Sequence, residues 1–260
     1  AKVLSTGRIA YLKWDFNRNI TDAGSALLPA DRQTEFFHRF ILGTYDLMDR
    51  LTTQFPDILF ENCSGGGGRF DPAMLYYSPQ IWASDNTDPI ERLYIQFGTS
   101  LCYPASTVGA HVSACPRTGY ETKGNVALWG TFGYELDPRK LTENDRTIVR
   151  RQVALYHDTY DLIRTGDLYR LVSPFDNAFR AVWQIVSEDK SRTMVTLVTM
   201  RMDYIPHTIL RLRGLEPDRI YEDEQTGKRY SGALLMNAGL NLTYTANSDG
   251  ASAVLLFRAV

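Results

Sequence analysis

Short apolar runs along the first two thirds of the chain are each followed at once by polar residues. Three of these runs, at residues 9–12, 58–60 and 80–83, have the length and composition of buried strands. The polar residues after them lie where each strand is expected to end. Proteins built from parallel strands place their active sites at this end of the strands. The pattern therefore predicts a site assembled from several strand ends.

Helical periods separate the strand-like runs. Apolar residues recur at helical spacing over about residues 32–54, after Asp31 as a candidate cap and before Pro56, which stops a helix. Asp71 and Pro72 are expected to start a short helix. Further helices are expected at about residues 89–102 and 143–164, and further strands at 110–114 and 126–132. This alternation of strand and helix predicts a parallel sheet.

The last third of the chain has a different pattern. Beyond about Asp167 no long helical period follows, and turns rich in Ser, Gly, Asn and Asp separate short apolar runs. These runs lie at residues 183–186, 193–200, 208–212 and 253–257. Their spacing predicts antiparallel strands. We therefore expect two domains, an α/β part at residues 1–166 and a C-terminal all-β domain at residues 167–260.

Composition describes a globular protein without an extreme of charge. The chain has 260 residues, of which 44% are hydrophobic and 22% charged, and its net charge is -2. That balance gives no reason to expect a nucleic acid or an anionic membrane as partner, and no apolar run reaches membrane-spanning length. Three cysteines without a CxxC pair argue against a disulfide framework. The four histidines lack metal-binding spacing, so neither a metal nor a cofactor is expected.

Candidate chemistry begins in the first strand, which turns polar at Lys13. Because a strand alternates its faces, Lys13, Asp15 and Asn17 are expected on one face, with Trp14 and Phe16 on the other. An ammonium beside a carboxylate favours the ionised form, which a nucleophilic carboxylate needs. Charge pairs of this kind are also often structural. From these residues alone, a solvated and inert Lys–Asp pair stays open.

Two further polar loops follow the second and third strands. Residues 65–68 are four glycines without the Lys-Ser/Thr ending of a phosphate-binding loop. They either let a backbone approach something closely or form a flexible turn. Residues 84–88 bring Asp85 and Asp88 together, and such carboxylates either cap a helix or donate a proton. From these residues alone both interpretations stay open, and Asp88, beside Pro89, is the better placed of the two as a cap.

Five motifs stand in a fixed order along the first half of the chain. They are KWDFNR at 13–18, FENCSGGGGRFD at 60–71, SDNTD at 84–88, GAHVSA at 109–114 and GTFGYELD at 130–137. Together they resemble the α-galactosidases of glycoside hydrolase family thirty-six. The resemblance is strong over residues 11–141 and weak in the tail.

The resemblance implies a retaining glycosidase on a (β/α)8 TIM barrel. This chain would supply the second half of the barrel, strands four to eight, followed by a C-terminal antiparallel β-sandwich domain. The nucleophile at the end of the fourth strand would be Asp15, and the acid/base at the end of the sixth would be Asp85. A retaining glycosidase needs one ionised and one protonated carboxylate about 5 Å apart. Lys13 beside Asp15, and the carboxylate-rich loop around Asp85, fit that division of roles.

The resemblance also implies a set of substrate-binding residues: Lys13, Trp14, Phe16, Asn17, Cys63 and Gly66. The family's enzymes are far longer and carry a large N-terminal β domain and the first barrel strands. Two adjacent aspartates and an arginine that grip the sugar lie in that part. We therefore expect this chain to be a C-terminal portion that needs the N-terminal part for activity. The loop at residues 114–120 is shorter than the family pattern.

The expected function is a retaining exo-α-galactosidase, which removes terminal α-linked galactose from melibiose- and raffinose-type sugars by double displacement. An α-N-acetylgalactosaminidase, a galactosyl-transferring relative and a non-catalytic sugar-binding fragment stay open as alternatives. The size of the pocket near Cys63 would distinguish an α-galactosidase from an α-N-acetylgalactosaminidase. Activity of the isolated chain on an aryl α-galactoside would distinguish an enzyme from a sugar-binding fragment. The expected partner is a galactose-terminated oligosaccharide, with no nucleic acid and no membrane. We also expect a homo-oligomer of the full-length chain and a cytoplasmic location of bacterial type.

Overall fold

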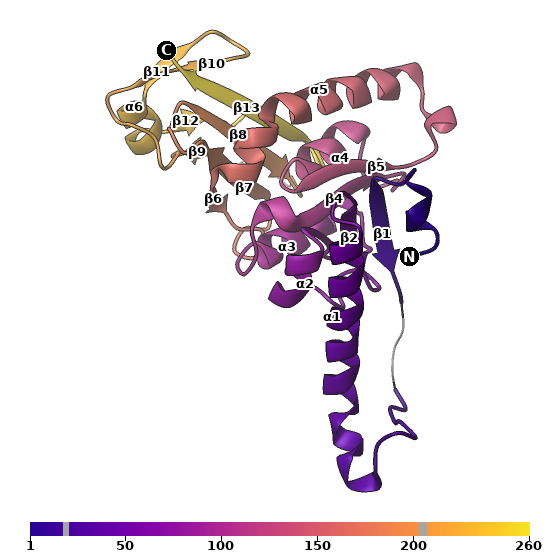
Figure 1. The fold of residues 1–260 in the computed structure, drawn as a ribbon. Coiled ribbons are helices and arrows are strands. Elements are labelled where there is room, and N and C mark those ends of the chain that lie inside the picture. Colours follow the sequence, from indigo (N-terminus) through magenta and orange to yellow (C-terminus); the bar gives the residue numbers. More distant parts are fainter. Residues whose placement is uncertain (18–20, 203–206) are drawn as a thin grey trace. The chain divides into compact units, whose positions relative to one another are not determined.

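The structure is a computed structural model that describes residues 1–17, 21–202 and 207–260 (Figure 1). The chain forms two compact units, Ala1–Asp85 and Asn86–Val260, which we call the N-terminal and C-terminal units. Both contain parallel strands and helices, and the C-terminal unit adds antiparallel sheets. Arg18, the last residue of the first motif, lies outside the described residues.

Three parallel strands form the centre of the N-terminal unit. They are β1 (Tyr11–Asp15), β2 (Leu59–Cys63) and β3 (Gln80–Trp82), with β2 between the other two. The register sets Lys13 opposite Glu61 and Asp15 opposite Cys63. Glu61 in turn lies opposite Gln80 of β3. All three expected strands are confirmed, although the first begins at Tyr11 rather than residue 9.

Two α-helices connect these strands, α1 (Phe36–Gln54) and α2 (Pro72–Tyr77). The expected helix start at residue 32 is wrong, because a 3-10 helix, η2 (Ala30–Glu35), precedes α1 and contains Asp31. The Gln33 amide of η2 binds the preceding loop, accepting from the Ser25 N–H at 3.0 Å and donating to the Leu28 carbonyl at 2.6 Å. The cap expected for the short helix is confirmed, since Asp71 accepts from a backbone N–H of α2 at 2.8 Å.

One face of the three strands is apolar and packs against the two helices. Its cluster contains buried Leu4, Met48, Leu51, Phe60, Met74 and Ile81, with partly buried residues that include Leu12 and Trp14. The strand members stand at alternate positions, as a pleated strand requires. Lys13, Asp15, Glu61 and Cys63 occupy the intervening positions. The N-terminal unit therefore has one strand face for packing and one that carries polar groups.

The C-terminal unit begins with the same alternation of helix and strand. Its first elements are α3 (Pro89–Thr99), η3 (Ala105–Thr107), β4 (Val108–Ser113), α4 (Tyr120–Ala127), β5 (Thr131–Glu135), η4 (Pro138–Lys140) and α5 (Glu143–Thr165). Strands β4 and β5 are parallel. The helices expected at 89–102 and 143–164 are confirmed, and α5 starts with a reciprocal cap between Thr142 and Asp145.

The strand expected at residues 126–132 is wrong in its first half. Helix α4 runs to Ala127, and β5 begins only at Thr131. The sequence hides α4 because its last six residues are all buried, so no apolar stripe faces a polar one. Gly124 fits against the Gln152 amide of α5, where a Cβ atom would lie 2.1 Å from the side-chain carbon. Burial on several sides therefore explains why the sequence pattern did not reveal α4.

Antiparallel sheets form the remainder of the C-terminal unit. Its elements are β6 (Asp167–Val172), β7 (Arg180–Val186), β8 (Arg192–Thr199), β9 (Ile209–Leu210), β10 (Ile220–Asp223), β11 (Arg229–Ser231), α6 (Gly232–Asn237), β12 (Leu240–Asn241) and β13 (Ser252–Ala259). The larger sheet has the order β11-β10-β13-β8-β7-β6, and β9 pairs with β12. The expected antiparallel strands are confirmed, whereas the short helix α6, capped by Ser231, was not expected.

Both faces of the larger sheet are packed. On one face Ala181, Trp183 and Ile185 of β7 join a cluster with Leu93 of α3 and Ile163 of α5. The intervening residues Val182 and Val186 of β7 join a second cluster with side chains from β9, β10 and α6. The indole rings of Trp129 and Trp183 stack with centroids 4.5 Å apart. Burying aromatic rings of this size contributes much of a core's stability.

Candidate active site

Two rows of polar side chains lie on the open face of β1 and β2. Asp15 and Cys63 form the upper row at the strand ends, and Lys13 and Glu61 form the row beneath. Successive residues on one face of a strand are about 6.6 Å apart. Asp15 is exposed, whereas Cys63 and Glu61 are each 1% exposed. An accessible carboxylate is thus supported by buried polar groups.

The four-glycine segment brings the Asp85 backbone close to the end of β2. A Cβ atom on Gly66 would lie 2.6 Å from Ser84 Cα and 2.8 Å from Asp85 N. A Cβ atom on Gly67 would lie 2.5 Å from the Ala83 carbonyl oxygen. Gly66 also has φ of 78°, a conformation that favours glycine. The glycines therefore allow two backbone segments to approach closely, which is one of the two interpretations of this run. The second segment is Ala83–Asp85.

The Cys63 thiol lies between the two candidate catalytic carboxylates. Its Sγ is 3.7 Å from Asp85 Oδ1, and the register places it opposite Asp15. Burial, opposed by the Gly66 N–H and helped by the carboxylates of Asp15 and Asp85, raises the pKa of the Cys63 thiol to about 11. The thiol is therefore neutral at ordinary pH. Cys63 is thus a neighbour of both aspartates, of Asp15 across the strand pair and of Asp85 through the thiol contact.

Lys13 is held by Glu61 and Trp82, neither of which was expected from the sequence as its partner. Its Nζ lies 3.7 Å from Glu61 Oε1 on the neighbouring strand and 5.3 Å from the centre of the Trp82 ring. The sequence predicted Asp15 as the carboxylate beside Lys13. The structure adds a second carboxylate, that of Glu61, on the neighbouring strand. Residues two apart along a strand share a face. Because Cys63 was assigned to the site, the same rule would have placed Glu61 on the site's face.

Asn17 and Arg69 surround the upper row. Asn17 accepts a hydrogen bond from the Gly65 N–H, so the strand end and the glycine segment are joined. Arg69 donates to the Phe16 carbonyl at 3.0 Å, and its guanidinium lies 3.3 Å from the centre of the Phe16 ring. Burial lowers the pKa of Arg69 and the Asp15 carboxylate opposes that shift. Arg69 is therefore a second residue of the site that sequence reasoning missed.

The two aromatic residues of the first motif are placed differently from the polar ones. Trp14 belongs to the apolar cluster with Met48 of α1, on the packed face of β1. Trp14 and Phe16 also line a cavity of about 450 Å³ beside α1, with Phe40 and Leu47. The structure brings Lys13, Asn17, Cys63 and Gly66 to the polar face with the carboxylates and leaves Trp14 on the other face.

Asp88 and Asp85 have different surroundings. Asp88 Oδ1 accepts from the backbone N–H groups of Ile90 and Glu91 at 2.9 and 3.1 Å, which caps α3. The expected cap is confirmed. Asp85 is exposed and has the Cys63 thiol as a contact. Of these two aspartates, Asp85 is therefore the one whose carboxylate is not bound to a helix terminus.

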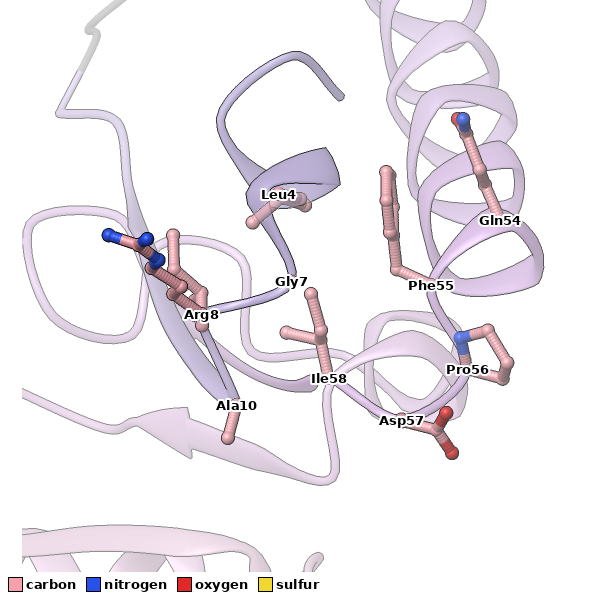
Figure 2. Close-up of a pocket in the computed structure, with 10 residues that line it drawn as sticks. Leu4, Gly7, Arg8, Ala10, Gln54, Phe55, Pro56, Asp57 and Ile58 are labelled. Carbon is pink, nitrogen blue, oxygen red and sulfur yellow. The ribbon is translucent and has the colours of Figure 1, made fainter.

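A separate cavity of about 490 Å³ opens near the beginnings of β1 and β2 (Figure 2). Leu4, Phe55 and Ile58 line it, and the charged ends of Arg8 and Asp57 point away from one another. It lies at the opposite end of the strands from Asp15 and carries no pair of carboxylates. Within the described residues, no group of three or more His, Cys, Asp and Glu side chains could hold a metal ion.

Family models match both parts of the chain. The model named Melibiase matches residues 1–166, and the model named glycosyl hydrolase family 36 C-terminal domain matches residues 180–257. The first match covers more than half of the chain. The chain belongs to the melibiase family, and the resemblance read from the five motifs is confirmed.

The relatives are α-galactosidases. AgaA of Geobacillus stearothermophilus is 48% identical over 100% of this chain, which covers 36% of that protein. Mel36A of Lactobacillus acidophilus is 45% identical over 92% of this chain, which covers 33% of that protein. A crystal structure of substituted AgaA in complex with raffinose has a TM-score of 0.95 and 48% identity, covering 100% of this chain and 37% of that one. The chain thus spans about a third of the length of these relatives.

None of the helices in the described part of the chain is both long enough and apolar enough to cross a membrane. The parallel strands and antiparallel sheets match those of the α-galactosidase structures.

Proposed function

We propose that this chain carries the catalytic residues of a retaining exo-α-galactosidase. The observation that supports it most directly is the position of the Cys63 thiol, which lies 3.7 Å from Asp85 Oδ1 and opposite Asp15 in the register of β1 and β2. Asp15 ends β1 and Asp85 follows β3, on either side of β2, and a pair of carboxylates at one site is what a retaining glycosidase needs. The names of the relatives and the raffinose complex of AgaA supply the sugar, which is galactose in α linkage.

In the proposed first step, Asp15 is the nucleophile and Asp85 the acid. The Asp15 carboxylate attacks the anomeric carbon of the galactosyl group, and the bond from that carbon to the leaving oxygen breaks. Asp85 gives its proton to that oxygen as it departs. The product of this step is a galactosyl ester on Asp15.

In the proposed second step, water enters where the leaving group was. Asp85, now ionised, takes a proton from the water as it attacks the same carbon, and the bond to Asp15 breaks. Two inversions leave the configuration of the sugar unchanged. Asp85 is protonated again and ready for the next cycle.

Lys13, Asn17, Cys63 and Gly66 form the proposed sugar site around these carboxylates. Lys13 supplies a cation and hydrogen-bond donors, and Asn17 an amide. Cys63 and Gly66 bound the space beside the Asp85 backbone. Trp14 lies in the packing cluster of α1, and Phe16 supports Arg69, so both act as scaffold in this proposal.

The proposal extends to the architecture of the whole enzyme. Strands β1 to β5 correspond to strands four to eight of a (β/α)8 barrel within residues 1–166, and residues 167–260 form a β-sandwich domain. The run of parallel strands before Asp167 and antiparallel strands after it supports this division. The homo-oligomer and the cytoplasmic location rest on the family resemblance.

The test uses the full-length enzyme and a p-nitrophenyl α-galactoside. Proton NMR during the first turnovers is expected to show α-galactose before mutarotation, and raffinose is expected to release galactose. Methanol added as acceptor should give methyl α-galactoside. Release of β-galactose first would contradict the two-step mechanism, and absence of galactose release would contradict the function.

A further inference from the structure

A buried carboxylate, Glu61, lies in the row beneath the proposed sugar site. Its side chain is 1% exposed. Glu61 Oε2 accepts hydrogen bonds from Gln80 Nε2 at 2.9 Å and from the Tyr11 hydroxyl. Glu61 Oε1 has no hydrogen-bond partner among the described residues and faces Lys13 Nζ at 3.7 Å. A buried carboxylate without a compensating cation is costly, so this oxygen favours the ammonium nearby.

Lys13 is restricted on two sides by this arrangement. Glu61 lies on one side, and the Trp82 ring, 5.3 Å from Nζ, on the other. A lysine side chain has a flexible four-carbon stem and loses much rotamer freedom when held in one place. The Lys13 side chain is still 31% exposed, so its ammonium can reach a ligand on the open face.

We propose that Glu61 is a positioning residue for galactoside binding and acts through Lys13. The inference rests on the proposed function, in which Lys13 contacts the sugar. Glu61 itself lies one row below Asp15 and Cys63 and is closed to solvent, so it does not touch the substrate. Gln80 and Tyr11 fix the orientation of its carboxylate, and the carboxylate fixes the place of the ammonium. The sugar then meets a cation that is already in position.

A purely structural role for Glu61 predicts a different dependence of activity on Lys13. If Glu61 only stabilises the strands, its loss lowers activity by the same factor whether or not Lys13 is present. If Glu61 acts through Lys13, its loss has no effect once the ammonium is gone. A double-mutant cycle separates these two cases.

The cycle uses Glu61→Gln, Lys13→Met and the double variant in the full-length enzyme, with kcat/KM measured on p-nitrophenyl α-galactoside. Glu61→Gln is expected to lower kcat/KM by about 10- to 100-fold, the effect of a misplaced charged hydrogen-bond donor. In the Lys13→Met background the same change is expected to alter it by less than about twofold. Equal losses in both backgrounds, or no loss in either, would overturn the proposal.

Tyr11→Phe is the second variant, in case Glu61→Gln folds poorly. It keeps the carboxylate charge and removes one of the bonds that orient it. Its smaller loss of kcat/KM should also vanish in the Lys13→Met background, and persistence there would contradict the inference. Wild-type turnover is measured first, because an enzyme that does not release galactose refutes the proposed function, whereas an active enzyme with an additive cycle refutes only the role of Glu61.

Discussion

The strands of the two units meet different surroundings. β1 and β2 of the N-terminal unit pack one face against α1 and carry Lys13, Asp15, Glu61 and Cys63 on the other. β7 of the C-terminal unit is buried along its whole length, and its alternate residues enter two different clusters. The polar face of β1 and β2 reaches solvent at Asp15 and therefore has a position for chemistry, whereas β7 is buried at every residue. Substitutions in the two places should therefore separate activity from stability.

The largest effect is expected from Asp15→Asn in the full-length enzyme. Removal of the nucleophile should lower kcat on an aryl α-galactoside on the order of 10⁴-fold. The melting temperature should change little, because Asp15 is exposed. Asp46→Asn is the control, since that carboxylate is 70% exposed on α1. Near-normal activity of the Asp15 variant on an activated substrate would reject the assignment.

Trp183→Ala should show the opposite behaviour. Loss of the buried ring that stacks on Trp129 is expected to lower the free energy of unfolding by about 3–5 kcal/mol. The kcat per folded molecule should stay close to that of the wild type. Leu234→Ala, at a 43% exposed position of α6, is the matched apolar control. Urea unfolding measures both, and a cost below about 1 kcal/mol for Trp183→Ala would show that this core is not the stabilising one.

Asp85→Ala and Asp88→Ala test which carboxylate is the acid. Without its acid the enzyme should lose about 10²- to 10⁴-fold on raffinose and far less on a substrate with an acidic phenol, which leaves without a proton. Asp88→Ala should cost about 1 kcal/mol of stability through its lost cap, without that dependence on the leaving group. If the dependence appears for Asp88→Ala instead, the acid is assigned to the wrong aspartate.

Gly66→Ala should affect both stability and activity. The new methyl group would meet the Ser84 and Asp85 backbone at 2.6 and 2.8 Å. A cost of about 1–3 kcal/mol and a displaced Asp85 are expected, with raffinose hydrolysis reduced more than that of an activated galactoside. Gly43→Ala, in α1 with open space around it, should instead stabilise by about 0.5–1 kcal/mol. Similar behaviour of the two variants in thermal unfolding would contradict the close approach.

The smallest effect concerns thiol reactivity. The pKa of Cys63 is raised to about 11, so the thiol is protonated below that pH and its thiolate fraction falls about tenfold for each pH unit of decrease. Iodoacetamide at pH 8 should modify exposed Cys102 and leave Cys63 nearly unmodified, with the Cys63 rate rising as pH increases. Peptide mass spectrometry reports each site. Equal labelling at pH 8 would mean that Cys63 is neither buried nor close to the two carboxylates.

Local sequence determined the elements whose signals lie close together along the chain. The cap from Asp88 to α3, the helix α5 and the polar turn after each early strand all depend on neighbours a few residues away. The five motifs identified the family for the same reason, because they are contiguous. Asp15 and Asp85 could be proposed from such signals, since Asp15 ends one strand and Asp85 lies in the polar turn after another.

Tertiary structure decided the contacts between residues far apart in the sequence. Lys13 meets Glu61 because the register of β1 and β2 aligns them, and no local pattern states that register. The glycine segment needs its glycines because the Ala83–Asp85 backbone lies against it, a distance known only after folding. Helix α4 escaped prediction because burial on several sides removed the stripe that reveals a helix. Periodicity reports a single boundary between core and solvent, and residues enclosed on all sides have no such boundary.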